Sequence, residues 1–368
     1  HITGIIPEPY FCDREKETTW MVRTLGNKAH VLLTSPRRMG KTQLVRHVFE
    51  QSPIKDNYYT FYTDIYPTTS LNELVLFLSK EIYAVLVPKG KTVLNKFLAG
   101  LHSLAGSFGY DPISNTPTFN IKLGDIHSPE LTLEEIFRYL EQADKPCIFA
   151  IDEFQQIAEY EEANIEALLR TKIQKCKNTH FIFAGSRQHI MNEMFYSRNK
   201  PFYQSAISMS LEPIPQDVYC DFAQKMFTAR NKKIEAEAIL KAYSLFGGTT
   251  WFVQMVMNEL FSITPEKGMC PESFLEIALQ NIILLQEQQY KDTLTLFSAK
   301  QKMLLLAIAQ EGTAREVTSA AFIAKYWLSS ASSVQASLKG LMKKMVITED
   351  DGGYRLSDFF FAYWLRQR

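Results

Sequence analysis

The sequence predicts a doubly wound α/β domain, followed by an all-helical segment and a C-terminal winged helix. Two observations predict the α/β domain. Short β-prone runs alternate with amphipathic helical segments over residues 1–210, and the run at 147–151 is apolar throughout. Such a strand is typical of a parallel sheet covered by helices on both faces. After residue 210 the strand signal disappears until near the end of the chain, which indicates separate domains there.

The elements of the α/β domain follow from hydrophobic periodicity. In chain order we expect a strand at 31–34, a helix from residue 42, a strand at 58–65, helices at 70–86 and 131–143, a strand at 147–151, a helix at 163–177 and a second buried strand at 180–184. Ser70 is a suitable N-cap because its hydroxyl can accept a hydrogen bond from a helix N–H. Residues 89–124 are mixed and give no clear prediction.

The rest of the chain predicts two helical domains. Helices are expected at 216–229, 234–246, 251–262 and 271–285, and then at 299–310, 319–327 and 332–344. The last three precede short β-prone runs at 346–349 and 354–356, which an Asp-Asp-Gly-Gly turn joins into a hairpin. Three helices and a hairpin predict a winged helix. The expected domains are therefore an α/β core at 1–210, an all-α domain at 211–290 and a winged-helix domain at 291–368.

Composition excludes several classes of protein. Hydrophobic residues make up 46% of the 368 residues and charged residues 22%, which excludes a largely disordered chain. The 40 basic residues balance the 40 acidic ones, so any contact with nucleic acid or membrane must come from a local patch. No run is long and apolar enough to span a bilayer. We expect no membrane contact.

Cysteine usage and the chain start bear on location. The five cysteines are odd in number and form no CxxC pair, which argues against disulfides and a zinc site and suits a reducing cytoplasm. Residues 1–10 lack the basic start and apolar stretch of a signal peptide. A start at His1 leads us to expect that residues are missing before it. The chain is therefore expected to be cytoplasmic.

Residues 35–42 (SPRRMGKT) fit the phosphate-binding pattern GxxxxGK[ST], except that Ser35 stands in place of the first glycine. In this pattern backbone N–H groups wrap the phosphates, and the following helix points its positive end at them. Lys41 would reach the β and γ oxygens, and the Thr42 hydroxyl would bind Mg²⁺. Gly40 would let the backbone approach closely. The residues expected to line the nucleotide here are Pro36, Arg37, Arg38, Met39, Gly40, Lys41, Thr42 and Gln43.

Two alternatives stay open for this segment on its own. A Gly-Lys-Thr run can arise by chance at a helix start, although the strand before it and the helix after it favour the phosphate loop. Arg37 and Arg38 either contact phosphate or lie in solvent.

Two carboxylates end the apolar strand at 147–151. Asp152 would hold the Mg²⁺ shell, and Glu153 would orient or activate the attacking water. The carboxyl ends of parallel strands are where open α/β sheets bind ligands. A charged pair at a strand exit is common by itself, but this pair follows the phosphate loop by about 110 residues within the same α/β pattern. The two motifs together predict binding of ATP with Mg²⁺.

A third strand, at 181–184, ends in Gly185, Ser186 and Arg187. A strand of this kind lies next to the acidic strand in many ATPases and can bring a polar group near the γ-phosphate. Arg187 is therefore a candidate γ-phosphate sensor. The alternative is an arginine in an ordinary strand-to-helix loop.

Four segments together carry a family resemblance: 11–17 (FCDREKE), 34–42 (TSPRRMGKT), 151–157 (IDEFQQI) and 185–187 (GSR). They resemble the archaeal-type P-loop ATPases, relatives of the AAA+ and STAND ATPases that also occur in bacteria. That family commonly has S-P-R-R-x-G-K-T as its phosphate loop, so Ser35 is expected there. The resemblance covers nearly the whole chain and implies an α/β ATPase core, a helical lid and a C-terminal winged helix.

The resemblance also implies roles for single positions. The segment around Phe11 and Arg14 would lie beside the adenine base, and residues 185–187 match the arginine-bearing sensor strand of STAND proteins. Residues 246–248 (FGG) match the lid turn that closes over the nucleotide, but the proline that relatives often have after it is absent here. No arginine finger can be assigned.

The winged helix has two open interpretations. Its last helix and its end carry basic residues suited to DNA phosphates, namely Lys339, Lys343, Lys344, Arg355, Arg366 and Arg368. Apolar residues share that helix, and specific DNA interfaces are usually more basic than this, so packing or binding of a protein partner is the other interpretation. The aromatic run at 358–364 predicts core or a domain interface.

We expect an ATP-hydrolysing molecular switch with slow turnover, whose lid and winged helix rearrange with the state of the nucleotide. Its catalytic residues would be Lys41, Glu153 and Arg187, and Thr42 and Asp152 would hold the metal. One alternative is a DNA-binding regulator gated by nucleotide. Another is a nucleotide-stabilised scaffold without catalysis, against which Glu153 argues. A nucleotide-dependent homo-oligomer and a DNA or protein partner are the expected assemblies.

Overall fold

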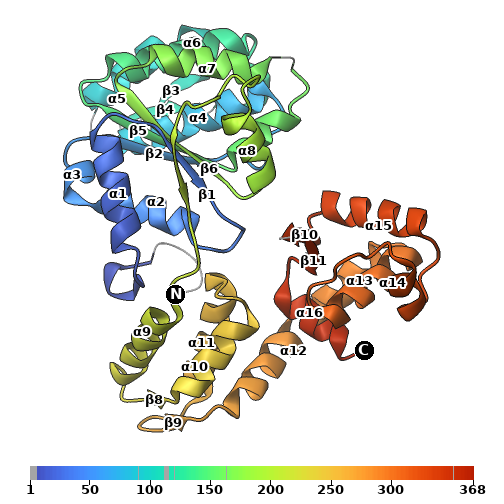
Figure 1. Ribbon diagram of the computed structural model, residues 1–368. Helices are drawn as coiled ribbons and strands as arrows, with labels where there is room; N and C mark the ends of the chain where they lie inside the picture. The colour runs from blue at the N-terminus through green and yellow to red at the C-terminus, as the bar shows by residue number, and fades with distance from the viewer. Residues whose placement is uncertain (1–5, 90, 112–115, 120, 163, 351) are drawn as a thin grey trace. The chain divides into compact units, whose positions relative to one another are not determined.

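The computed structural model describes residues 6–89, 91–111, 116–119, 121–162, 164–350 and 352–368. The expectation about residues preceding His1 therefore falls outside the described residues. The chain divides into two compact units, one spanning Thr3–Ile214 and the other containing Pro215–Arg368. Figure 1 shows the elements of both units.

A parallel sheet forms the centre of the first unit and confirms the predicted fold class. Within the described residues it has five strands in the order β2-β5-β6-β1-β7. Every neighbouring pair is parallel. The strands are β1 (Val31–Thr34), β2 (Tyr59–Asp64), β5 (Cys147–Asp152), β6 (Thr179–Gly185) and β7 (Ile207–Ser210).

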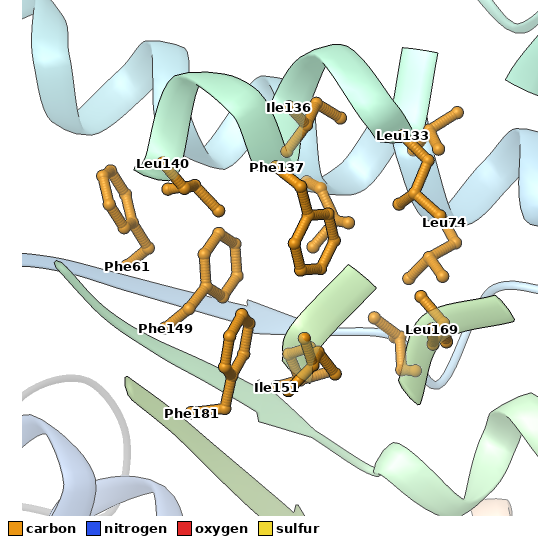
Figure 2. Packing of buried hydrophobic residues seen from close by; sticks show 14 of the residues in the cluster. Phe61, Leu74, Leu133, Ile136, Phe137, Leu140, Phe149, Ile151, Leu169 and Phe181 are labelled. Carbon is orange, nitrogen blue, oxygen red and sulfur yellow. The ribbon is translucent and has the colours of Figure 1, made fainter. Parts of the chain in front are cut away.

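Helices cover both faces of this sheet because its central strands are apolar on both sides. Every residue of β5 and β6 is buried. Alternate residues serve opposite cores, as strand geometry requires. Ile148 and Ile182 pack with the helices α1 (Glu15–Gly26) and α2 (Lys41–Glu50). On the other face, Phe149 and Phe181 pack with α4 (Leu71–Leu86), α6 (Pro129–Gln142) and α7 (Ile165–Lys175), as Figure 2 shows.

The helices at 70–86, 131–143 and 163–177 are confirmed with small shifts at their ends. They are α4 (Leu71–Leu86), α6 (Pro129–Gln142) and α7 (Ile165–Lys175). Ser70 caps α4 as expected, since its side chain accepts from the N–H of Glu73. The structure adds elements that periodicity did not predict: α1, α3 (Ser52–Lys55), α5 (Lys91–Gly100), α8 (Gln188–Tyr196), β7, and a hairpin of β3 (Phe108–Asp111) and β4 (Thr116–Phe119). Edge strand β7 is exposed at most positions, so no apolar run marks it.

The first helices of the second unit are α9 (Gln216–Thr228), α10 (Ala236–Leu245), α11 (Thr250–Ile263) and α12 (Phe274–Thr295). Helix α12 runs beyond the predicted end at 285, because no glycine or proline interrupts 286–295. The prediction of no strands before the C-terminal hairpin is wrong, since β8 (Lys233–Ile234) pairs with β9 (Met269–Cys270). Two-residue strands are too short to show periodicity. Among the described helices, none has the length and apolar character needed to cross a membrane.

The winged helix comprises α13 (Ala299–Glu311), α14 (Ala320–Lys325), α15 (Ala331–Lys343) and the antiparallel pair β10 (Ile347–Asp350) and β11 (Gly353–Leu356), followed by α16 (Phe359–Arg366). Serines cap all three main helices, as the side chains of Ser298, Ser319 and Ser330 accept backbone N–H groups. Such caps fix each helix start.

An aromatic cluster joins α10 and α11 to α16 within the second unit. The Phe360 ring is fully buried and lies 5.3 Å from the rings of both Phe246 and Phe252. Phe359 packs edge-on to the same two rings. This confirms that the aromatic run at 358–364 is core, and it packs α10 and α11 together with the winged helix in one compact unit.

Phe360→Ala is expected to lower the free energy of unfolding of the second unit by about 3–5 kcal/mol, because a buried ring leaves a cavity. Chemical denaturation followed by circular dichroism measures this. The control is Leu284→Ala, whose side chain is 72% exposed and whose loss should change stability by no more than about 0.5 kcal/mol. Equal effects of the two substitutions would show that the cluster does not hold this unit together.

Candidate nucleotide site

Three neighbouring strands end at one edge of the sheet and bring the sequence motifs together. Strand β6 lies between β1 and β5, and Thr34 of β1 stands beside Gly185 of β6 in register. On the other side of β5, Asp64 of β2 stands beside Asp152. The phosphate loop, the acidic pair and residues 185–187 therefore lie at the same edge of the sheet. The order of these motifs along the chain does not by itself show this.

The loop at 35–40 has the backbone conformation of a phosphate cradle. Arg38 and Gly40 have positive φ angles of 67° and 92°. At Gly40 nothing lies within 4 Å of where a Cβ would be, so the dihedral angle and not crowding favours glycine. Gly40, at the N-cap of α2, has no side chain with which to cap the helix. The first-turn N–H groups and the positive dipole end of α2 therefore suit a bound anion.

Ser35, which stands where the usual pattern has glycine, binds the side chain of Lys41. Its side chain is fully buried. Its hydroxyl lies 3.3 Å from Lys41 Nζ, which also donates to the carbonyls of Ser35 (3.2 Å) and Pro36 (3.4 Å). Lys41 is thus folded back onto its own loop, with hydroxyl and carbonyl oxygens as acceptors.

Lys41 is a buried cation without a bound carboxylate. It is 7% exposed, and among the described residues it forms no ion pair. Burial lowers its pKa, against the opposing influence of Asp152 and Glu153. A buried charge without a partner is unfavourable. A phosphate in the loop would supply the missing negative charge.

Asp152 is bound by hydroxyl groups from two other elements. Thr42 Oγ1 donates to Asp152 Oδ2 at 2.9 Å, and the Tyr62 phenol donates to the same oxygen. Tyr62 OH also lies 3.2 Å from Thr42 Oγ1. Burial and the Asp152 carboxylate raise the pKa of Tyr62, so the phenol stays protonated as a donor. The Arg46 guanidinium lies over its ring at 4.9 Å.

Sequence reasoning missed Tyr62 and Arg46. No motif marks Tyr62, since it is one of the regular positions of β2, and only the β2–β5 pairing brings it beside the acidic strand end. Thr42 and Asp152 offer the hydroxyl and carboxylate oxygens that Mg²⁺ takes together with phosphates and water. No group of three or more metal-binding side chains occurs among the described residues. The donor set therefore fits a phosphate-bound Mg²⁺ and not an all-protein metal cage.

Tyr62→Phe removes the phenol that orients Asp152. Outer hydrogen-bond partners of metal ligands typically contribute about 10–100-fold to metal affinity. We therefore expect the Mg²⁺ concentration for half-maximal ATP binding to rise by about that factor. Nucleotide titrations at fixed ATP and varied Mg²⁺ measure it, with Tyr196→Phe, an exposed tyrosine on α8, as control. An unchanged Mg²⁺ dependence would show that Tyr62 only packs.

Two polar side chains bind one oxygen of the half-buried Glu153 carboxylate. Its Oε2 accepts from Ser186 Oγ at 2.7 Å and from Gln155 Nε2 at 2.5 Å. Its φ angle is 55°, a conformation rare for a residue with a side chain. Such strain at a strand end is typical of functional positions. Gln155, fully buried, was not predicted.

Gly185 is required beside this carboxylate. A Cβ there would lie 2.5 Å from Gln155 Oε1 and 2.6 Å from Met191 Cγ. A larger residue would therefore displace Gln155 from Glu153. The sequence showed Gly185 only as part of a family pattern, and the structure gives its physical reason.

Arg37, and not Arg187, contacts the Ser186–Glu153 pair. Arg37 Nε donates to Ser186 Oγ at 3.4 Å, and its guanidinium lies over the Tyr66 ring at 5.2 Å. Arg187 instead pairs with Glu159. In this structure the predicted sensor is engaged with a neighbouring carboxylate, so a role on phosphate stays a prediction that requires this pair to open.

The remaining predicted site residues have mixed positions. The Phe11 ring stacks on His47 of α2 at 4.0 Å. Arg14 is buried, pairs with Glu17 at 2.6 Å and donates to the Glu212 carbonyl at 2.7 Å. Arg14 thus links the first helix to the last residues of the first unit. These contacts involve protein groups only, and the predicted place of Arg14 beside an adenine base stays a prediction.

The side chains of two residues in the phosphate-loop region contact other parts of the protein. Met39 is 4% exposed and belongs to the core cluster on the α1–α2 face. The Gln43 side chain accepts from the Ile6 N–H at 3.3 Å.

Comparison with known proteins gives two family matches. A model described as an ATPase domain predominantly from Archaea matches residues 11–256, and a probable winged helix domain matches residues 288–367. An uncharacterized ATP-binding protein of Methanocaldococcus jannaschii is 28% identical over 167 residues, which are 40% of this chain and 44% of that protein. The chain thus spans under half of that relative.

Two solved structures share the fold. A Walker-type ATPase of Pyrococcus abyssi has a TM-score of 0.67 and 19% identity, covering 100% of this chain and 99% of that one. The ORC2 protein of Aeropyrum pernix, solved in ADPNP–ADP complexes, has a TM-score of 0.56 and 12% identity, with 99% and 94% covered. At these identities the likeness concerns the fold.

Proposed function

The chain belongs to the family of ATPase domains found predominantly in Archaea, and from this premise we propose that it is a Mg²⁺-dependent molecular switch that hydrolyses ATP slowly. It is of the AAA+/STAND-related type. Its nucleotide state sets the arrangement of its domains or its affinity for a partner. A winged helix domain also matches its C-terminal part.

Lys41 carries this proposal. A lysine that is almost fully buried, with only oxygens of its own loop as acceptors, is stabilised when an anion binds beside it. The uncapped start of α2 and the positive φ angles of the loop present N–H groups to the same place. Charge and geometry together favour the triphosphate of ATP.

The residues divide the chemistry among them. Lys41 and the loop N–H groups bind the phosphates and oppose the charge that develops during phosphoryl transfer. Thr42 and Asp152 would hold Mg²⁺, which would neutralise phosphate charge. Glu153 orients the attacking water and accepts its proton. Arg37 is positioned to act on Glu153 through Ser186.

The hydrogen bonds of Glu153 support the proposal of slow turnover. Its carboxylate already accepts hydrogen bonds from Ser186 and Gln155. Each charged hydrogen bond contributes about 1.5–3 kcal/mol. Donors to one carboxylate oxygen stabilise the charged form and make the carboxylate a weaker base toward water. This favours a switch over a high-turnover enzyme.

The second unit is built to respond as one body. The lid turn contains Gly247 and Gly248, both with positive φ angles, and follows Phe246 directly. Phe246 packs against Phe359 and Phe360 of α16. If the turn closes over a nucleotide, the aromatic cluster carries its displacement to the winged helix.

Two measurements test the proposal on the purified full chain. Phosphate release with ATP and Mg²⁺ is expected to be slow but above background, and lost in EDTA. Size-exclusion light scattering with ADP and with a non-hydrolysable ATP analogue is expected to differ in mass or radius. A protein that binds neither nucleotide, releases no phosphate and elutes identically in both states contradicts the proposal.

A further inference from the structure

A hollow of about 330 Å³ lies within the second unit. It is formed where the end of α10 meets the end of α13, strand β11 and helix α16. Figure 1 shows β11, α13 and α16 together in the C-terminal part of the chain, and these three elements contact one another. Ligand sites in proteins commonly have volumes from about 300 Å³ upwards. The hollow is therefore large enough for one small organic molecule.

One wall of the hollow is apolar and belongs to the core. Its residues are Leu245, Phe246, Leu356, Phe359 and Ala362. Phe246, Leu356 and Ala362 are buried, and the Phe359 ring lies edge-on to the Phe246 ring at 5.8 Å. Because packing holds these side chains in place, the wall is formed before any ligand arrives. It suits a compact apolar or aromatic group.

Arg366 brings a positive charge to the hollow. Its Nε donates to the Ala309 carbonyl near the end of α13, which fixes the guanidinium group. This bond uses one of the five N–H groups of the side chain. In the part of the chain that the structure describes, Arg366 has no ion pair, and its other side-chain N–H groups have no hydrogen-bond partner. They are thus left to bind an anion that enters the hollow.

Gly312 makes room for this guanidinium group. It follows the last residue of α13 and has a φ angle of 75°. A Cβ at this position would lie 3.1 Å from Arg366 Nη2. Any larger residue would therefore be strained and would also press against the guanidinium group. The glycine allows Arg366 to stay at the hollow.

The charge of Arg366 is not matched within the lining. Glu311 is the carboxylate of the lining, but Lys325 and Tyr326 each donate to its Oε1 at 2.6 Å, and these bonds lower its pKa. Lys325 therefore balances the charge of Glu311. Arg355 is a second arginine of the lining, and its guanidinium lies over the Phe359 ring at 5.6 Å. The hollow thus combines positive charge with an apolar wall.

This combination favours a carboxylate over a phosphate. A guanidinium group matches the two oxygens of a carboxylate with two parallel N–H bonds. A phosphate monoester brings a charge of about −1.5 to −2 and three acceptor oxygens. One unpaired arginine beside an apolar wall does not satisfy that group. A carboxylate on an apolar body uses both parts of the lining.

We propose that this hollow binds a small carboxylate with an apolar or aromatic body. Arg366 pairs with the carboxylate, Arg355 lies beside it, and the body packs against Phe246 and Phe359. Two sources share this chemistry, namely a free organic acid and the C-terminus of a polypeptide that ends in an apolar residue. The proposal concerns the second unit alone and does not depend on ATP hydrolysis.

The test is isothermal titration of the full chain with phenylacetate, its neutral analogue phenylacetamide, acetate, and the dipeptide N-acetyl-glycyl-phenylalanine with a free carboxylate. Phenylacetate is expected to bind about tenfold more tightly than phenylacetamide, because the amide loses a charged hydrogen bond. Acetate should bind more weakly than phenylacetate, since it lacks the apolar body. Tighter binding of phenylacetate than of the dipeptide identifies a free acid as the source, and the reverse order identifies a polypeptide C-terminus.

Arg366→Gln is expected to lower the affinity for phenylacetate about tenfold and to abolish the preference over phenylacetamide. Thr313→Trp, at an exposed position of the lining, should block the hollow while both arginines stay in place. The matched control is Arg368→Gln, the same change two positions further on. Arg368 does not line the hollow and pairs with Glu287 at 3.0 Å, so the affinity should stay within about twofold of the parent.

Each contrary outcome overturns the site. If the parent binds neither phenylacetate nor the dipeptide, the hollow is not a carboxylate site. Equal losses in the two arginine variants indicate a diffuse surface charge, and equal affinity for acid and amide shows that Arg366 does not bind the ligand. Unchanged binding by Thr313→Trp places the ligand elsewhere. Circular dichroism and ATP binding on the same preparations separate these results from misfolding and from failure of the ATPase proposal.

Discussion

Lys41→Ala is expected to abolish measurable ATP turnover and to weaken ATP binding at least tenfold. The Lys41 ammonium group is the buried side-chain cation of the loop and is expected to reach the β and γ oxygens. A hydrogen bond to a charged group contributes about 1.5–3 kcal/mol, and every 1.4 kcal/mol is about a factor of ten in affinity. Loss of a preorganised donor to the developing charge costs about 10²–10³ in rate. Isothermal titration with ATP and a phosphate-release assay measure the two effects.

The same substitution carries an unusual stability prediction. Without nucleotide, Lys41 is a buried cation with no ion pair among the described residues. Replacing an unpaired buried charge removes a desolvation cost. We therefore expect the Tm of nucleotide-free Lys41→Ala to equal or exceed that of the parent, while stabilisation by added ATP disappears.

Lys55→Ala is the control for this prediction. Lys55 is exposed and pairs with Glu50 at 2.7 Å, so it tests loss of a lysine without loss of the site. It should keep both ATP binding and turnover, because exposed ion pairs contribute little. Normal ATP binding by Lys41→Ala would remove the basis of the proposed function.

Glu153→Gln is expected to lower ATP turnover about 10²–10⁴-fold, the range of a general base, while ATP binding is kept. Glutamine has nearly the same shape but cannot take a proton from water. Its amide can still accept from Ser186 and Gln155, so the strand end should keep its structure. Single-turnover phosphate release separates this loss of chemistry from any change in binding.

The matched control is Glu159→Gln, which makes the same substitution on an exposed carboxylate six positions along the chain. It pairs with Arg187 and not with the Ser186–Glu153 pair. Turnover is expected to stay within a few-fold of the parent. Unchanged turnover in Glu153→Gln would favour a nucleotide-stabilised scaffold, and a large loss in Glu159→Gln would show that the Arg187 pair is part of catalysis.

Much of the fold could be predicted because each element carries a local signal. The run at 147–151 is apolar over its whole length, and the helix after Ser70 has both a cap and a regular apolar face. The elements that were missed lack such signals. Edge strand β7 is mostly exposed, and β8 and β9 have two residues each. Their conformation depends on partners from elsewhere in the chain.

For the site, the sequence by itself determined the ends of the strands that carry chemistry: Lys41 and Thr42 after the first, Asp152 and Glu153 after the second, Ser186 after the third. These residues can be recognised from the sequence because each directly follows an apolar, β-prone run. The residue types at such a strand end are visible without knowledge of the rest of the fold. The phosphate loop departs from the usual pattern at Ser35, and the structure shows the serine holding Lys41.

Only the tertiary structure decided which groups act together. The order β2-β5-β6-β1-β7 puts Tyr62 beside Asp152 and Ser186 beside Glu153, and it leaves Arg187 on Glu159. The physical reason is that strand pairing and helix packing optimise apolar contact over the whole sheet, and polar side chains meet as a consequence of that pairing. Sequence spacing fixes what each strand end carries, and the fold decides what lies next to it.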